Sequence, residues 1–410
     1  MKEAQEAVEQ EQRSIVKEII EQGLLTTYFQ PLVSLKGGKV MGVEALTRGW
    51  HQETLVMPSV LFEQADQLGQ RLHLDRLCRD RAFAAFQARQ GEDWLLFVNI
   101  DASILTEGVV GSDYLLESVR AKGVEPERVV IEISENGNQS PLLLERFIDQ
   151  YRRHGFMIAL DDVGVGDSNF ARILIAKPDV IKIDRCMVQN LMQDAYKREI
   201  FSALVTLARR VGALTVAEGV ETEEEAMAAW ELGADLAQGY YYGRPVAADR
   251  LQCDAVNAKM KETAADYQQY KIEKIARSYE RQTQYKLVVE KLLQRIKSCQ
   301  PDDFSAVLRS MLCENSVECL YVLNSRGVQV TESLCQEKLG CSKRLFQPAT
   351  KGSDQSAKNY CLHIMAGREM YVSDPYVSYA TGNLNRTISR LFRAADGKEY
   401  ILCVDFYFSE

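Results

Sequence analysis

The chain alternates between short apolar runs and longer amphipathic stretches over most of its first 245 residues. The amphipathic stretches include 142–154 and 197–211, where apolar residues recur with the period of a helix. The apolar runs are rich in β-branched residues, as strands are, and fall at 26–34, 39–46, 94–100, 128–133, 157–161, 179–183, 214–218 and, more weakly, 233–237. Repeated strand–helix units favour a mainly parallel sheet, and about eight of them predict a (β/α)₈ barrel.

The first two predicted strands do not follow this alternation of strand and helix. Only residues 36–38, Lys-Gly-Gly, separate 26–34 from 39–46, so no helix can connect them. A connection this short is typical of a β-hairpin, whose strands run antiparallel. The pattern therefore predicts an α/β fold, a modified TIM barrel that contains one antiparallel strand. Before these strands, residues 5–23 have the apolar spacing of an amphipathic helix.

Two further regions follow the predicted barrel. Residues 250–298 contain neither Pro nor Gly and carry apolar residues at helical spacing, which predicts a long helix or a helical hairpin. After residue 300, short strand-like segments recur, and Asp396-Gly397 is a strong hairpin turn, which predicts a small antiparallel sheet with a few helices. We therefore expect three parts, a barrel at 1–250, a helical linker at 251–300 and a small α+β domain at 301–410.

Composition narrows the class of protein. Lys and Arg number 49 against 58 Asp and Glu, a net charge of −9, which argues against general binding to nucleic acid. No window holds about 18 uninterrupted apolar residues, and the N-terminus lacks the basic and apolar regions of a secretory signal. We therefore expect a cytoplasmic protein that does not bind membranes. Its ten cysteines are expected to be buried thiols, and a redox or metal-sensing role is the alternative.

Carboxylates recur where the predicted strands end. With one lysine and one asparagine among them, the set comprises Glu44, Asn99, Glu132, Asp161, Asp162, Lys182, Asp184, Glu218 and Glu221. The C-terminal strand ends of a (β/α)₈ barrel converge on one mouth, where so many acids would repel one another unless cations bind them. Oxygen ligands without His or Cys select hard ions such as Mg²⁺ or Mn²⁺, and a shared carboxylate such as Asp161 could bridge two of them. The alternatives are that single acids cap helices or are solvated loop groups, and that Lys182 only pairs with Asp184.

These residues resemble those of the EAL-domain family, the cyclic di-GMP phosphodiesterases. The tripeptide that names the family is Glu44-Ala45-Leu46, within GVEALTR. The other matching motifs are, in order, YFQP at 28–31, FVNID at 97–101, EISE at 132–135, DDVGVG at 161–166, IKIDR at 181–185, AEGVET at 217–222 and QGYYYGRP at 238–245. Each motif is short, and their joint order and spacing over about residues 15–247 carry the resemblance.

The resemblance implies a role for each matching residue. Two Mg²⁺ or Mn²⁺ ions would bind to Glu44, Asn99, Glu132, Asp161 and Asp162. The catalytic residues would be Lys182, Glu218 and Gln238. Cyclic di-GMP would contact Gln30, Leu46, Arg48, Asp184, Glu221 and Pro245, and Glu135 would anchor the DDVGVG loop. The implied reaction is in-line attack of water on one phosphodiester, which gives linear pGpG.

One loop departs from the family pattern. The usual sequence from the paired aspartates onward is DDFGTGYSSL, whereas this chain has DDVGVGDSNF at 161–170. An aromatic residue is lost and a charge is gained at Asp167, which would loosen the site, while both aspartates and both glycines are kept. A barrel that binds cyclic di-GMP as a receptor, without hydrolysing it, is therefore the main alternative to an enzyme. A scaffold with a vestigial nucleotide site is a third.

The last region has a second resemblance, to PAS/Cache-type sensory domains of the kind appended to one group of cytoplasmic EAL proteins. The matching segments are YVLNSRGVQVTES at 321–333, YVSDPYVSYATG at 371–382 and ADGKEYILCVDF at 395–406. It implies a sensory or regulatory domain, with a dimerisation or stability module as the alternative. Residues 371–381 would line a pocket for an unidentified small ligand, unless their aromatic residues only fill the core. The EAL family commonly dimerises, so a homodimer is also expected.

Overall fold

The structure is a computed structural model that describes residues 2–89, 91–133, 140–165, 169–312, 316–336 and 346–408. The chain divides into two compact units, Met1–Tyr270 and Lys271–Glu410. Each unit has its own sheet and its own hydrophobic core. Among the helices of the described residues, none is both long enough and apolar enough to cross a membrane.

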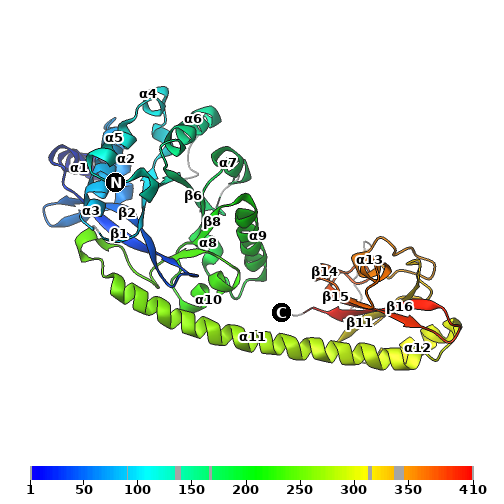
Figure 1. The fold of residues 1–410 in the computed structure, drawn as a ribbon. Helices are drawn as coiled ribbons and strands as arrows, with labels where there is room; N and C mark the ends of the chain where they lie inside the picture. Colours follow the sequence, from blue (N-terminus) through cyan, green and yellow to red (C-terminus); the bar gives the residue numbers. More distant parts are fainter. Residues whose placement is uncertain are drawn as a thin grey trace. The chain divides into compact units, whose positions relative to one another are not determined.

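The first unit is a closed eight-strand barrel (Figure 1). Its strands are β1 (Leu25–Ser34), β2 (Lys39–His51), β4 (Leu95–Ile100), β5 (Val129–Ile133), β6 (Met157–Val163), β7 (Val180–Ile183), β8 (Leu214–Ala217) and β9 (Leu236–Gln238). The strands from β2 to β9 pair in parallel, and β1 closes the barrel by pairing antiparallel with both β2 and β9. The short β3 (Thr54–Val56) and β10 (Val246–Ala247) extend the sheet beside β2 and β1. The predicted barrel with one antiparallel strand is confirmed.

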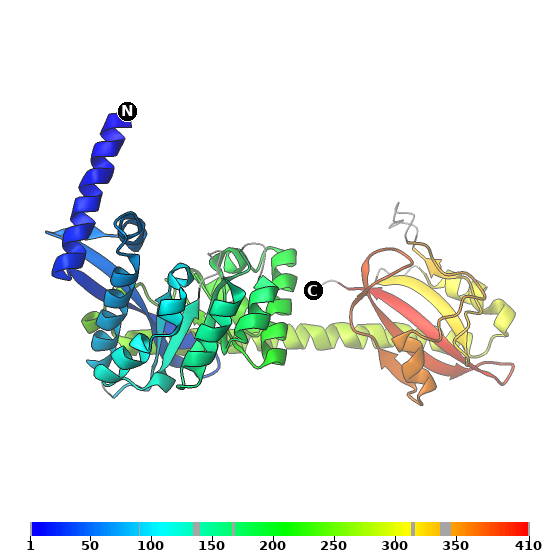
Figure 2. The ribbon, with the colours of Figure 1, turned by 90° about the horizontal axis from the view of Figure 1, so that it is seen from above.

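Helices cover the outside of the barrel (Figure 1). They are α2 (Pro58–Gln67), α3 (Arg71–Gln87), α4 (Glu107–Val110), α5 (Tyr114–Ala121), α6 (Pro141–Arg152), α7 (Asn169–Ala176), α8 (Arg185–Val188), α9 (Ala195–Val211) and α10 (Glu223–Glu231). The main core lies between these helices and the strands, and includes the fully buried Phe83 and Phe201. The first helix, α1 (Lys2–Gln22), projects beyond α2 in Figure 2, while its later residue Ile19 joins a smaller core with Leu61 of α2.

The inside of the barrel is filled in two layers. The first layer is apolar and takes side chains from seven strands, Leu32, Phe97, Val130, Ala159, Val180, Val216 and Leu236. Side chains alternate between the two faces of a strand, so the residue two positions further along also points into the barrel. In the parallel strands that residue lies nearer the C-terminal mouth. These second positions are polar, and they form the candidate site.

The helix α11 (Cys253–Ile296) crosses the boundary between the two units as one continuous element of 44 residues. The hairpin alternative for this region is therefore wrong. Within the first unit, α11 places Met260 in the main core and stacks Tyr267 on Trp230, with ring centroids 4.5 Å apart. Its final turns place Leu292 and Ile296 in the core of the second unit.

The second unit is built on an antiparallel sheet in the order β12-β11-β16-β15-β13, with β14 beside β15. The strands are β11 (Val317–Asn324), β12 (Leu334–Cys335), β13 (Met370–Val372), β14 (Tyr376–Val377), β15 (Leu384–Arg393) and β16 (Glu399–Tyr407). The long hairpin of β15 and β16 turns at Asp396-Gly397, as predicted. The end of α11 and α12 (Phe304–Ser310) pack on one face of the sheet, and α13 (Asn359–Met365) packs on the other (Figure 1).

The cysteines correct one expectation, that all ten are thiols. Cys319 of β11 and Cys335 of β12 lie opposite each other in the antiparallel pair and form a disulfide, with Cα atoms 4.1 Å apart. They are separated by 16 positions in the sequence, so only the strand pairing brings them together. The remaining described cysteines are free thiols, namely Cys78, Cys186, Cys253, Cys299, Cys361 and Cys403.

Replacing Cys335 with alanine should destabilise the second unit. A disulfide that closes a loop of 16 residues stabilises a domain by about 3 kcal/mol, chiefly by restricting the unfolded chain. We expect the free energy of unfolding of this unit to fall by about that amount in Cys335→Ala under oxidising conditions. Cys186→Ala, which removes an exposed free thiol, should change it little. Peptide mapping without reductant should recover Cys319 and Cys335 in one linked species, and two alkylated peptides would contradict the disulfide.

Candidate functional site

A polar layer fills the C-terminal mouth of the barrel. Six of its members lie two positions beyond the apolar layer, on β4 to β9 or the loops that follow them, namely Asn99, Glu132, Asp161, Lys182, Glu218 and Gln238. Glu44 of β2 joins them. Because β1 runs in the opposite direction, its contribution, Gln30, precedes the apolar Leu32 instead of following it. Strand alternation and the barrel closure thus bring together eight predicted site residues that are far apart in the sequence.

Lys182 lies at the centre of this layer and is almost completely buried. Its Nζ is 2.7 Å from Glu132 Oε1 and 2.7 Å from Glu218 Oε1. The same atom is 3.2 Å from Asp161 Oδ1 and 3.8 Å from Glu44 Oε2. Lys182 therefore pairs with carboxylates from four other strands or strand ends. Asp184 has a different role, because its Oδ1 accepts a hydrogen bond of 2.7 Å from Cys186 N and caps α8.

Burial and the closeness of several carboxylates shift the pKa values of the residues in this cluster. Burial, together with the neighbouring Glu44, holds the pKa of Glu132 well above its usual range, although Lys182 opposes this shift. Burial likewise raises the pKa of Glu218 despite its contact with Lys182. Burial lowers the pKa of Lys182, but the surrounding carboxylates, Asp161 first, outweigh that effect and raise it well above the ordinary value. One ammonium therefore does not neutralise the acids that surround it.

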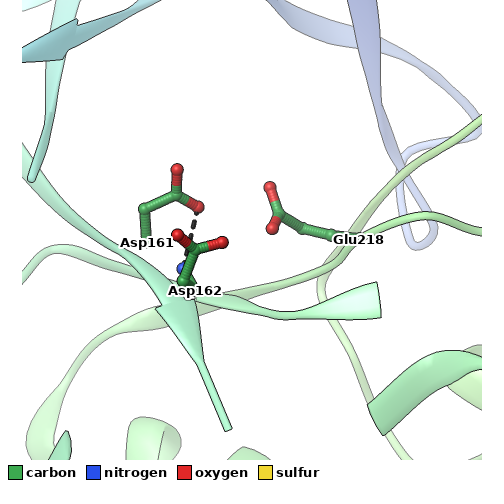
Figure 3. Close-up of side chains that lie close together, drawn as sticks. All are labelled: Asp161, Asp162 and Glu218. Atoms are coloured by element: carbon green, nitrogen blue, oxygen red, sulfur yellow. Dashed lines mark hydrogen bonds between the residues drawn. The ribbon is translucent and has the colours of Figure 1, made fainter. Parts of the chain in front are cut away.

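Asp161 and Asp162 reach the same side of β6 although they are consecutive. Neighbouring residues of a regular strand point to opposite faces. Here the pairing of β6 with β7 shifts register between Leu160 and Val163, and Asp162 adopts a left-handed backbone with φ 58°. The backbone N of Asp162 donates to Asp161 Oδ1 at 3.0 Å. In consequence, carboxylate oxygens of Asp161, Asp162 and Glu218 lie within 4.8 Å of one another (Figure 3).

The carboxylate of Glu44 is held by two side-chain amides. Asn99 Nδ2 donates to Glu44 Oε1 at 2.9 Å, and Gln238 Nε2 donates to Glu44 Oε2 at 2.6 Å. Gln238 Nε2 also lies 3.2 Å from Gln30 Oε1, and Gln30 Nε2 donates to the carbonyl of Gly243 at 3.2 Å. These contacts fix the orientation of Glu44 at the edge of the cluster.

A cavity of about 220 Å³ opens beside these residues. Its lining includes five predicted site residues, Gln30, Glu44, Glu218, Glu221 and Gln238. Leu46 lines a neighbouring cavity together with Asn99. Arg48 lies further along β2, where its guanidinium is 5.4 Å from the ring centroid of Tyr28. Pro245 immediately precedes β10, and the predicted loop anchor Glu135 lies outside the described residues.

Apart from two glycines, Gly219 and Gly239, two residues that line this cavity were not among the predicted site residues. Arg185 is the first residue of α8, and its guanidinium nitrogen lies 2.9 Å from Glu221 Oε1. Tyr240 follows β9, and the Arg244 guanidinium lies 4.3 Å from its ring centroid. Both belong to sequence motifs already noted, IKIDR and QGYYYGRP, so position within a motif was the available signal. They bring a cation and an aromatic ring to an otherwise acidic cavity.

The donor set fits divalent cations. All candidate ligands are oxygen donors, and the close trio of Asp161, Asp162 and Glu218 includes no His or Cys. Glu132 is completely buried, and its Oε2 accepts no hydrogen bond from any residue that the structure describes. A buried carboxylate oxygen without a donor is costly unless a cation contacts it. The fold and this cluster together define a (β/α)₈ barrel with an acidic mouth whose oxygen donors suit divalent cations.

A comparison with known protein families identifies the family to which this barrel belongs. The profile of the EAL domain matches residues 12–245, more than half of the chain. This chain belongs to the EAL-domain family. The matched range contains every residue of the polar layer and the cavity beside it.

The similarity to one relative extends over both units. YkuI of Bacillus subtilis, described as an uncharacterized EAL-domain containing protein, is 28% identical over 374 residues, which cover 88% of this chain and 90% of YkuI. The crystal structure of YkuI, in complex with substrate c-di-GMP and calcium, matches with a TM-score of 0.81 and 26% identity, over 96% of this chain and 99% of that chain. The second unit is therefore part of the likeness.

Other relatives match over a shorter range. The cyclic di-GMP phosphodiesterase RocR of Pseudomonas aeruginosa is 31% identical over 236 residues, which cover 55% of this chain and 59% of RocR. The structure of the PaMucR phosphodiesterase in complex with c-di-GMP has a TM-score of 0.52 and 28% identity, over 59% of this chain and 100% of that chain. Named phosphodiesterases thus share a region of about the length of the EAL match.

Proposed function

We propose that this chain hydrolyses cyclic di-GMP to linear pGpG with two bound divalent cations, Mg²⁺ or Mn²⁺. The observation that carries the proposal is the buried cluster of carboxylates around Lys182 at the mouth of an EAL barrel. Relatives named as cyclic di-GMP phosphodiesterases, and a structure of YkuI with c-di-GMP and calcium, support the choice of substrate.

The cations would be held by the oxygen donors of the polar layer. These are Glu44, Asn99, Glu132, Asp161 and Asp162. When bound, divalent cations polarise a phosphodiester and lower the pKa of a water that attacks phosphorus. The bulge in β6 serves this role, because it turns Asp161 and Asp162 toward the same place.

The remaining residues of the layer would position the reacting groups. Glu218 lies 2.7 Å from Lys182 Nζ, so this pair would orient the attacking water, with the Glu218 carboxylate as the acceptor of its proton. Gln238 would hold both Glu44 and the water, since its amide already contacts Glu44 at 2.6 Å. Gln30, Leu46, Arg48, Asp184, Glu221 and Pro245 remain the proposed contacts of the nucleotide.

The proposal is tested by two measurements on one preparation of the full chain. Cyclic di-GMP is incubated with Mg²⁺ or Mn²⁺ and pGpG is followed by chromatography, while binding is titrated with Ca²⁺ in place of those ions. We expect pGpG to form only with the divalent cation, and Glu44→Gln to reduce its formation at least about 10²-fold, because a carboxylate held by two amides becomes neutral. Glu53→Gln, an exposed acid near the end of β2, is the matched control.

One observation favours a second candidate function, a receptor that binds cyclic di-GMP without turnover. The sequence DDVGVGDSNF differs from the family pattern directly after the paired aspartates. Binding in the presence of Ca²⁺ without pGpG in Mg²⁺ or Mn²⁺ would establish the receptor and reject the enzyme. If cyclic di-GMP neither binds nor yields pGpG, both proposals are rejected, and a scaffold with a vestigial nucleotide site is the alternative that is left.

We further propose that the chain forms a homodimer and that the second unit regulates the barrel. Exposed apolar side chains support association, notably Phe170 and Leu174 of α7, which are 66% and 75% exposed. The continuity of α11 through both units supports regulation, because one helix contributes to both cores.

A further inference from the structure

The second unit contains a cavity of about 390 Å³ on the face of its sheet that carries α13. Tyr321 of β11 and Asp405 of β16 contribute to it from the sheet, and Lys358 and Tyr360 contribute from the start of α13. The segment 371–380 supplies Tyr371, Ser373, Asp374, Pro375, Tyr376, Ser378, Tyr379 and Ala380. This volume lies within the usual range for small-molecule sites, about 300–1,000 Å³. The aromatic residues of this segment thus line a cavity.

Asp405 is a buried carboxylate in this cavity, and no basic residue that the structure describes pairs with it. It is 3% exposed, and its Oδ1 accepts a hydrogen bond of 2.7 Å from Thr387 Oγ1. The Tyr321 hydroxyl lies 3.5 Å from the same oxygen. No Lys, Arg or His within the described parts of the chain forms an ion pair with Asp405. Burial, with a smaller contribution from the nearby Glu318, raises the pKa of Asp405 to about 7.

Gln329 provides a second acceptor at the cavity. Its Nε2 donates to the carbonyls of Thr331 and Ala349 at 3.0 and 3.1 Å and to Ser333 Oγ at 2.9 Å. Two of these acceptors are backbone carbonyls, so the orientation of the amide is fixed. Gln329 is 1% exposed, and its Oε1 accepts no hydrogen bond from any described residue. A buried acceptor of this kind is satisfied by a ligand that donates an N–H or O–H group.

Tyrosine rings form much of the remaining wall. Tyr360 lies between Tyr321 and Tyr376, with ring centroids 6.2 and 6.5 Å away. Ring faces of this kind attract cations, most strongly when water is excluded. Among the described residues of the lining, the only basic side chain is the exposed Lys358, whose Nζ already lies 5.0 Å from the ring centroid of Tyr379. The buried wall, as far as the structure describes it, therefore offers acceptors and ring faces and no cation that would bind an anion.

We propose that this cavity binds a small organic amine in its protonated form. The ammonium group would donate hydrogen bonds to Asp405 and to Gln329 Oε1, and the tyrosine rings would contact its carbon skeleton and share its charge. A carboxylate or phosphate ligand would meet the Asp405 carboxylate instead, and a neutral alcohol would offer it a hydrogen bond without the added attraction of opposite charge. This inference does not depend on the activity proposed for the barrel.

Calorimetric titration of the full chain tests the proposal with probes matched in size. Butylamine and 2-phenylethylamine are compared with butan-1-ol, 2-phenylethanol and butyrate. We expect at least one of the two amines to bind at least about tenfold more tightly than its alcohol, and butyrate not to bind. Equal affinity of both amines and their alcohols, tighter binding of butyrate, or no binding of either amine up to about 10 mM would each overturn the proposal.

A pair of isosteric variants locates the binding site. Asp405→Asn keeps the shape of the side chain and removes its charge, and it should weaken amine binding at least about tenfold. Asp302→Asn, an exposed acid in the same unit, should leave the affinity unchanged. An equal affinity in Asp405→Asn and the parent would place the amine elsewhere and overturn the proposal. The comparison of amine with alcohol binding uses the parent chain, so it tests the proposal even if Asp405→Asn fails to fold.

Discussion

Replacement of Lys182 by methionine is expected to reduce pGpG formation at least about 10²-fold while binding of cyclic di-GMP is kept. Methionine fills nearly the same volume but cannot donate to Glu132 and Glu218, which both lie 2.7 Å from Nζ. The water would lose the group that orients it, whereas the proposed metal ligands and nucleotide contacts would remain.

The same variant should also destabilise the barrel in the absence of divalent cations. Removal of one partner from a buried ion pair typically costs about 3–5 kcal/mol, because the other charge is left uncompensated. Here several carboxylates would lose their common partner, so the melting temperature in EDTA should fall clearly. Added Mn²⁺ should then raise the melting temperature of Lys182→Met by more than it raises that of the parent, since a cation replaces the lost charge.

Lys17→Met is the control for both measurements. Lys17 belongs to an exposed i,i+4 pair with Glu21, 3.8 Å apart, and such a pair contributes little. Turnover and melting temperature should therefore stay near the parent values. Hydrolysis by Lys182→Met at the parent rate would remove Lys182 from the chemistry.

Replacement of Asp162 by asparagine is expected to have opposite effects on stability and on turnover. Asparagine tolerates the left-handed backbone at φ 58° and keeps the shape of the side chain, so the fold should be preserved. It removes one of three carboxylates that lie within 4.8 Å of one another. In EDTA we expect the free energy of unfolding to rise by about 1 kcal/mol and the melting temperature by about 2–4 °C, because repulsion between like charges is reduced. Turnover should fall at least about 10²-fold, because a proposed metal ligand is lost.

Thermal melting with and without Mn²⁺, alongside the pGpG assay, separates these effects. The parent should gain stability when Mn²⁺ is added, and Asp162→Asn should gain less, since fewer carboxylates hold the ion. Asp149→Asn, an exposed acid of α6, should match the parent in both measurements. An equal response of Asp162→Asn and the parent to Mn²⁺ would exclude Asp162 as a ligand.

The sequence by itself determined the architecture of the first unit. Apolar runs of strand length between helical stretches predicted the barrel, and the three-residue connection at 36–38 predicted its antiparallel strand. Alternation along each strand also determined the site, because Phe97 and Asn99, or Val130 and Glu132, must face the same side. A local period of two residues is visible in any sequence, so these features did not need the tertiary structure.

Only the tertiary structure decided how the acidic residues combine. Strict alternation would separate Asp161 from Asp162, and the register shift beside β7 reunites them. The sequence offered Asp184 as a partner of Lys182, whereas closure of the barrel surrounds Lys182 with Glu132, Asp161 and Glu218. Such contacts depend on which strands become neighbours.

In the second unit, too, some features were predictable from the sequence and others depended on the tertiary structure. Its hairpin turn at Asp396-Gly397 was readable as a local signal, and the tyrosine-rich segment 371–381 marked the wall of a cavity. The disulfide between Cys319 and Cys335, and the buried Asp405 beneath the tyrosines, were not predictable. Both arise from the pairing of strands that are distant in the chain, and this pairing is set by the packing of the whole sheet rather than by any short stretch of sequence.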